Sequence, residues 1–161
     1  MNLFYLHSDP KVCAQYHVDA HVVKMPVEYA QCLSTVLRLR CGINFGYKPV
    51  YRKHPVTQWT GQNINNFAWM LSLGFAVCAE YTHRFGRVHA SQAVLEGIKD
   101  RLDRVRDVLP DEPMTEPPKC VSPQFKHLST IKACREYYRV VKARLHRWTD
   151  RKPPSWIGVE K

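Results

Sequence analysis

Hydrophobic and polar residues follow a helical spacing over much of the chain, most clearly between residues 17 and 36. Polar groups recur at steps of four, three, four and three, so a helix projects them from one face: His17, His21, Lys24, Glu28 and Gln31. An apolar stripe follows one position later: Val18, Val22, Met25, Tyr29, Cys32 and Val36. The pattern predicts an amphipathic helix whose polar face carries imidazole, amine and carboxylate groups, and we expect that face to line a pocket.

Other signals place the remaining elements. Ser8 or Asp9 before Pro10 predicts a helix start, whereas Pro26 predicts a kink or break, with the helix resuming to about Arg40. Further helices are expected from about Thr57 or Thr60 to Phe85, and over about 91–109 and 130–148. Irregular or extended chain is expected at 3–6 (a short strand or a buried arm), 42–58 and 110–123, where five prolines fall.

Length and composition favour one globular domain. A chain of 161 residues with 45% hydrophobic residues is long enough for one core and too short for two ordinary domains. No stretch reaches the 18 apolar residues of a membrane span, and the first residues lack signal-peptide features. We therefore predict an all-α, single compact domain over residues 1–161, with four to five helices and long irregular loops, present as a cytoplasmic monomer away from membranes.

The net charge of +10 is the strongest global signal for a partner. Small proteins this basic commonly bind nucleic acid, although a merely positive surface is the alternative. The aromatic and basic loop over 42–58 and the ends of the following helix supply the residues expected to contact double-stranded DNA: Tyr47, Lys48, Arg52, Lys53, Trp59, Asn63, Arg84 and Arg87. Arg84 and Arg87 are also explained as favourable charge at a helix C-terminus.

Metal and cofactor sites have little support. The six cysteines form no C-x-x-C pair and are expected to be reduced and buried. Cys13, His17 and His21 stand at successive helical turns, but a zinc site needs a further ligand presented by another element. No glycine-rich phosphate loop is present. We expect no metal and no cofactor.

The polar stripe, which is the polar face formed by His17, His21, Lys24, Glu28 and Gln31, has two interpretations. Lys24 is a candidate amine nucleophile, and Glu28, His17, His21 and His54 are candidate acids and bases. In the plainer interpretation the histidines are structural and Lys24 with Glu28 is an ordinary surface pair at i,i+4.

Several short features resemble a known family. Gln15-Tyr16-His17, Pro26, Lys53-His54-Pro55 and the pattern from Tyr51 to Gly86 are similar to the small pyrimidine-dimer DNA glycosylases of the phage endonuclease V family. The Phe-Tyr-Leu start and the His-Val-Val-Lys-Met run also look like uncharacterised small phage proteins. The resemblance covers roughly the first ninety residues and implies an all-α fold, duplex DNA binding, base flipping, and a Schiff base formed between an amine and the sugar. It also implies a phage protein that acts in the host cell.

The chain departs from that family at two positions. The helix position that carries a catalytic glutamate in the family is Lys24 here, and the nearest carboxylate on that face is Glu28, one turn later. The family's nucleophile is the amine of residue 2, freed by removal of the initiator methionine, and Asn2 is larger than the side chains that normally permit that removal.

Three functions follow from this pattern. The first is a DNA glycosylase, with AP-lyase activity through an amine and with Lys24 as nucleophile. The second is a phage DNA base-modifying transferase on the same scaffold, in which Lys24 only holds a phosphate or carboxylate. The third is a non-catalytic DNA-binding protein in which the polar stripe is structural.

Overall fold

The computed structural model describes residues 2–158, and the regular structure in that range is entirely helical. Its α-helices are α1 (Pro10–Tyr16), α2 (Asp19–Arg40), α3 (Pro55–Thr60), α4 (Ile64–Phe85), α5 (Ser91–Lys99), α6 (Leu102–Arg106) and α7 (Thr130–Val141). Three single 3₁₀ turns accompany them: η1 (Pro123–Phe125), η2 (Ala143–Leu145) and η3 (Ser155–Ile157). The predicted all-α class is confirmed.

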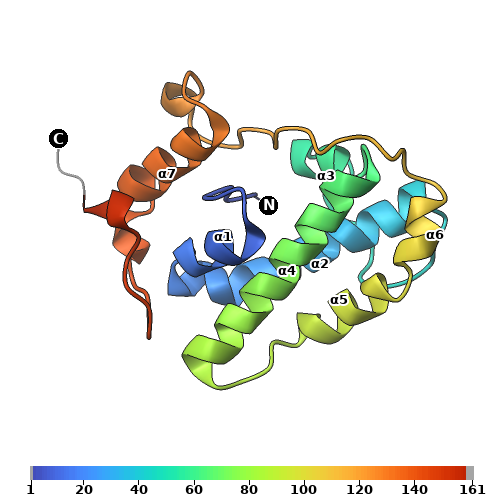
Figure 1. Cartoon of the computed structure of the whole chain (residues 1–161), viewed down its shortest axis with the longest axis horizontal. Coiled ribbons are helices and arrows are strands. Elements are labelled where there is room, and N and C mark those ends of the chain that lie inside the picture. Colours follow the sequence, from blue (N-terminus) through green and yellow to red (C-terminus); the bar gives the residue numbers. More distant parts are fainter. Residues whose placement is uncertain (1, 159–161) are drawn as a thin grey trace.

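Two long helices of 22 residues each, α2 and α4, form the centre of the molecule. In Figure 1, α4 (green) crosses α2 (blue), α1 lies at one end of the pair, and α3 and α5 flank the other. The segment that follows α6 runs in extended form past α3 to α7 (Figure 1). Residues 110–122 contain no helix, as their prolines predict.

The predicted helix through residues 17–31 is wrong at its start. α1 ends at Tyr16, and His17 caps it with an extended backbone (φ −64°, ψ 135°), so the polar stripe begins on one helix and continues on the next. Pro26 does not break α2, which runs continuously through it. Met25 and Tyr29, on either side of the proline, are fully buried, and this packing keeps both halves of the helix in one register.

Other boundaries also differ from the expectations. The helix predicted from Thr57 or Thr60 to Phe85 begins only at Ile64, after a separate short helix and a turn at 61–63, and the one over 91–109 is divided at Asp100 and Arg101. The last long helix ends at Val141, short of Trp148. Each extra break raises the helix number above the four or five expected. Residues 3–6 form a buried extended arm, and the described chain contains no strand.

Local capping explains where several helices begin and end. The Asp9 side chain accepts hydrogen bonds from the backbone nitrogens of Lys11 and Val12, with Pro10 in the first turn of α1, as the sequence predicts. Gly86 ends α4 in the left-handed conformation (φ 65°), which glycine adopts without steric cost. Among residues 2–158, no helix has the length and apolar character needed to cross a membrane.

Candidate functional site

The carboxylate of Glu28, near the middle of α2, is the centre of the candidate site. Its Oε1 lies 2.9 Å from Nζ of Lys24, and its Oε2 accepts a hydrogen bond of 3.3 Å from the backbone nitrogen of Asn2. Glu28 is only 7% exposed, so these partners supply much of what water would otherwise provide. The buried arm thus brings the second residue of the chain onto a nearly enclosed carboxylate.

Lys24 does not lie in a pocket. Its side chain is 64% exposed, and it pairs with Glu28 one turn away along the same helix. An amine in this position is surrounded by water, so the burial expected to activate it is absent. The structure corrects the prediction of a pocketed lysine, although it keeps Lys24 and Glu28 together.

His17 is a structural residue of the core. It is fully buried, and its Nδ1 lies 2.8 Å from the carbonyl oxygen of Cys13, which can only accept a hydrogen bond. Nδ1 therefore carries the proton, and Nε2 accepts from the hydroxyl of Tyr29 at 3.1 Å. Burial lowers the pKa of His17 to about 4. The prediction that His17 serves as a catalytic acid or base is corrected, because both ring nitrogens already have protein partners.

His21 is held in the same way by other partners. Its ring stacks on Phe4, with centroids 4.2 Å apart, and its Nδ1 lies 2.5 Å from the hydroxyl of Tyr138. That hydroxyl also accepts the backbone N–H of Val18, so the ring and the start of α2 share one tyrosine partner. Burial lowers the pKa of His21 to about 3, assisted by nearby cationic groups. His21 is 6% exposed and is uncharged at neutral pH, contrary to the catalytic role expected for it.

His54 lies within range of the charge of Glu28. It caps α3, since its Nδ1 accepts the backbone N–H of Val56 at 3.2 Å. Partial burial lowers the pKa of His54, and the negative charge of Glu28 opposes that shift. The structure therefore brings three predicted residues into one area: Lys24, Glu28 and His54.

The residues expected to contact DNA divide into two groups. The exposed ones are Lys48, Arg52, Lys53 and Arg87. Arg52 and Lys53 directly precede His54 in the chain, so they belong to the same area as Glu28. Arg87 follows the opposite end of α4 from α3, about 30 Å away along that helix.

The second group is used by the fold itself. Tyr47 is half-buried and its hydroxyl bonds Ser91, while Trp59 is 6% exposed and donates Nε1–H to the carbonyl of Thr115. Asn63 is buried, and its Oδ1 accepts the backbone N–H of Asn66 in the first turn of α4. These positions do not offer the base or phosphate contacts that the sequence indicated.

Arg84 is also unavailable to DNA, because its guanidinium is buried in an ion-pair network. Its Nη1 is 3.0 Å from Oδ1 of Asp19, and its Nε is 3.1 Å from Oε2 of Glu80. The other oxygen of Glu80, Oε1, lies 2.6 Å from Nη2 of Arg151. Burial alone would raise the pKa values of both carboxyls. Hydrogen bonds from Thr149 and Arg84 lower that of Asp19, and the two arginines lower that of Glu80.

The cysteines and histidines do not build a metal centre. Over residues 2–158, no three side chains of His, Cys, Asp or Glu gather as metal ligands do. The thiol of Cys13 donates to the carbonyl of Phe4, and burial raises its pKa to about 12. Cys13 therefore behaves as a small buried residue.

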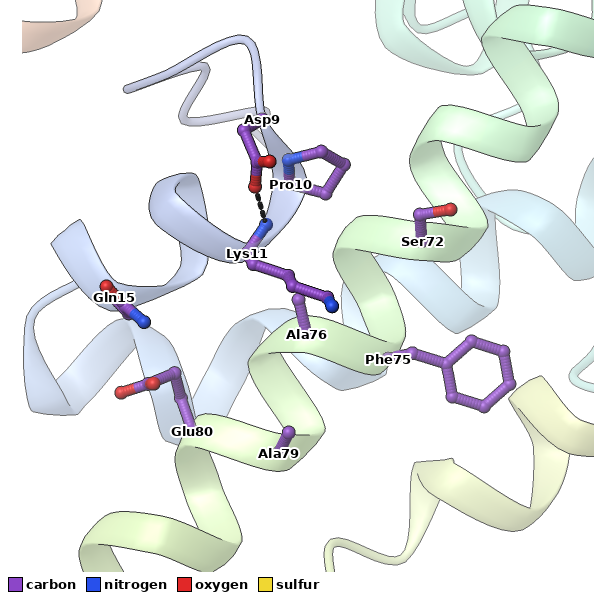
Figure 2. A pocket seen from close by; sticks show the side chains of 9 residues that line it. All are labelled: Asp9, Pro10, Lys11, Gln15, Ser72, Phe75, Ala76, Ala79 and Glu80. Carbon is purple, nitrogen blue, oxygen red and sulfur yellow. Dashed lines mark hydrogen bonds between the residues drawn. The ribbon is translucent and has the colours of Figure 1, made fainter.

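A hollow of about 660 Å³ lies between α1 and α4, away from Glu28. Figure 2 shows Lys11 extended along α4 above small alanine side chains, with Glu80 at the other end beside Gln15. Both of its carboxylates are committed, since Asp9 caps α1 and Glu80 pairs with Arg84. The hollow therefore lacks a carboxylate free for acid–base chemistry.

The structure places around the candidate residues three tyrosines to which the sequence assigns no role in the site. Tyr29 and Tyr138 supply the hydroxyls that hold the two buried histidines, and Tyr51 presents an exposed ring next to His54. Tyr138 is 117 residues from His21, so no local spacing indicates the pair. For Tyr51 the only sequence signal is an aromatic residue beside Arg52 and Lys53.

Comparison with known proteins adds no assignment. Neither the family models nor the curated proteins nor the solved structures contain a match to this chain. The resemblance to the pyrimidine-dimer glycosylases stays a prediction, and the site geometry must support any function.

Proposed function

We propose that this chain is a DNA glycosylase that acts on a flipped-out pyrimidine nucleotide through an amine, with Glu28 as its acid–base group. The observation that carries the proposal is the 3.3 Å contact between the backbone nitrogen of Asn2 and Oε2 of Glu28. A carboxylate that is nearly enclosed and faces nitrogen on both sides is suited to taking a proton from an attacking amine.

The reaction requires an amine that attacks C1′ of the nucleotide. The bond from C1′ to the base breaks, its electron pair leaves with the base, and the base takes up a proton. Glu28 accepts the proton that the attacking nitrogen loses. The sugar ring then opens to a Schiff base, which water hydrolyses or which undergoes elimination of the 3′ phosphate.

The amine we favour is the nitrogen of Asn2. Removal of Met1, which a side chain as large as that of Asn2 does not normally permit, would convert this nitrogen from an amide to a primary α-amine. The proposal requires this removal, and the mass of the trapped protein tests it. An α-amine has an ordinary pKa near 8, against about 10.4 for a lysine side chain, so a far larger fraction is neutral and nucleophilic at neutral pH. Lys24 then serves as the ion-pair partner of Glu28, and it replaces Asn2 as nucleophile only if Met1 is retained.

The charge of the protein supports DNA as the substrate. The chain carries a net charge of +10, and Arg52 and Lys53 are exposed directly before His54. Basic side chains beside the carboxylate would bind phosphates on either side of the flipped nucleotide.

Borohydride trapping tests the proposal. The protein is incubated with duplex oligonucleotides that contain an abasic site, uracil or a thymine dimer, and adducts are read by denaturing gel and intact mass. We expect an adduct whose protein mass lacks Met1. Glu28→Gln keeps the side-chain shape and should reduce trapping at least about a hundredfold, whereas Lys24→Ala should keep the adduct.

The matched control is the exposed pair Asp103 and Arg106 on α6. Asp103→Asn should trap as well as the unaltered protein. Full trapping by Glu28→Gln contradicts the role of the carboxylate, and loss of the adduct in Lys24→Ala moves the nucleophile to Lys24. No adduct on any substrate overturns the glycosylase assignment, and a heavier base in an intact strand would favour a transferase.

A further inference from the structure

Tyr51 is the one Phe, Tyr or Trp side chain among residues 2–158 that is classed as exposed, at 44%. The other exposed large hydrophobic residues are aliphatic: Val23, Leu39, Val88, Val108, Val140 and Val141. An aromatic ring left in water loses the burial that stabilises most aromatic residues. The fold therefore holds this ring outside the core.

The backbone of Tyr51 is also unusual. Its φ of 52° lies in the left-handed region, which bulky side chains rarely adopt and which costs about 1 kcal/mol or more. The turn is held by a hydrogen bond of 2.9 Å from the nitrogen of His54 to the Tyr51 carbonyl, and by Gln58, whose amide donates to the carbonyl of Arg52 at 2.6 Å. Glycine would occupy this conformation without strain, yet the chain places tyrosine there.

The turn is fixed relative to the candidate site. The hydroxyl of Thr35 on α2 accepts the N–H of Val50 at 3.0 Å, and its single proton is shared between the carbonyls of Gln31 at 2.8 Å and Val50 at 3.0 Å. Thr35 lies two helical turns from Glu28, about 10 Å along α2. On the other side, the Tyr51 ring lies edge to face with the ring of His54, and the two ring centroids are 6.3 Å apart. The ring is thus anchored next to the residues that surround Glu28.

The neighbours of Tyr51 are cationic. Arg52 and Lys53 are both exposed, and they follow Tyr51 in the same turn. An exposed aromatic ring beside basic side chains fits a nucleic-acid strand, because bases stack on the ring while phosphates pair with the cations.

We infer that Tyr51 is the residue that stacks in the duplex at the gap left by the flipped nucleotide, with Arg52 and Lys53 on the adjacent phosphates. This inference rests on the proposed function, because it takes DNA as the substrate and Glu28 as the centre of the reaction. Tyr51 is a positioning residue: it holds the distorted duplex, and the chemistry belongs to Glu28 and the amine.

The test uses a duplex with an abasic site beside 2-aminopurine, whose fluorescence falls when a ring stacks on it. The full chain should quench the probe. Tyr51→Phe should quench equally, because it keeps the ring. Tyr51→Gly should abolish quenching and weaken binding about tenfold, with thermal stability equal or higher because glycine relieves the backbone strain. Val88→Ala, at a residue 70% exposed, is the control and should behave like the unaltered chain.

The outcomes separate this inference from the proposed function. If the unaltered chain traps DNA with borohydride while Tyr51→Gly binds and quenches normally, the stacking role is wrong and the glycosylase proposal stands. If Tyr51→Phe loses as much as Tyr51→Gly, the hydroxyl rather than the ring acts, and stacking is wrong. If the unaltered chain does not bind the duplex, both proposals fall.

Discussion

His17 and His21 are buried histidines whose ring nitrogens bond tyrosine hydroxyls. A helical polar stripe in sequence puts both on the same face as Lys24 and Glu28. In the fold, Tyr29 and Tyr138 bind their ring nitrogens and the core excludes water from them. The exposed fraction of each side chain therefore decides whether it can reach a substrate. His17 and His21 are buried, whereas Lys24, on a neighbouring helical turn, is exposed.

The buried histidines predict an acid-sensitive fold. An unfolded histidine has a pKa of 6.5, whereas His17 in the fold has a pKa of about 4. Between these values the unfolded chain binds more protons, so the free energy of unfolding falls as the pH decreases from about 6.5 to about 4, by about 3 kcal/mol for His17 alone. Urea unfolding at pH values of about 7, 5.5 and 4 measures this loss.

The control for this titration is the exposed His127. His127→Gln should leave the dependence of stability on pH unchanged. Constant stability across that range in the unaltered protein would contradict the neutral, buried state assigned to His17 and His21.

At the scale of elements, the ring of Phe45 docks the loop that joins α2 to α3 onto α5. Phe45 packs against Gly97 of α5, and the guanidinium of Arg101 lies 3.9 Å from the centre of its ring. A Cβ at Gly97 would overlap the Phe45 ring. Gly97 thus allows the Phe45 ring to approach the backbone of α5 closely, and its conformational freedom is not what the position requires.

This contact predicts a non-additive pair of substitutions. Gly97→Ala should destabilise the protein by about 1–3 kcal/mol because the ring must move. In a Phe45→Ala background the same change should be neutral or stabilising, since alanine favours helix over glycine by about 1 kcal/mol. Thermal unfolding of the four proteins measures the coupling. Gly158→Ala, at a glycine with open space around it, is the control, and additive effects would contradict the packing argument.

At the scale of the whole molecule, Arg84 connects parts that are far apart in the chain. It binds Asp19 at the start of α2, Glu80 on α4 and the carbonyls of Gln15 and His17 around the junction of α1 and α2. Through Glu80 the network reaches Arg151 in the C-terminal segment. The sequence predicts that Arg84 binds DNA phosphates, but in the fold its charge joins the N-terminal and C-terminal segments.

Removal of Arg84 should therefore be costly. Arg84→Ala leaves two carboxylates without their buried partner, and we expect a loss of about 3–5 kcal/mol. Arg106→Ala, which removes the exposed partner of Asp103, should cost less than about 1 kcal/mol. Chemical unfolding of both variants decides the matter, and equal stabilities would show that the network contributes little.

The sequence alone determines the all-α class, the start of α1 at the Asp9 cap, the end of α4 at Gly86 and the extended proline segment. These features depend on local chemistry: caps, left-handed glycine, missing backbone donors and helical periodicity all act within a few residues. The pairing of Lys24 with Glu28 belongs here as well, because residues four apart on a helix meet whatever surrounds them.

Only the tertiary structure decides which polar residues face water and which distant residues meet. Burial of Arg84 and His17, the contact of Asn2 with Glu28, and the continuity of α2 through Pro26 all depend on packing between segments far apart in the chain. The strained φ of Tyr51 is likewise imposed by hydrogen bonds to Thr35 through Val50 and to His54. Such contacts leave no local pattern, because their energy comes from surfaces that meet only when the chain is folded.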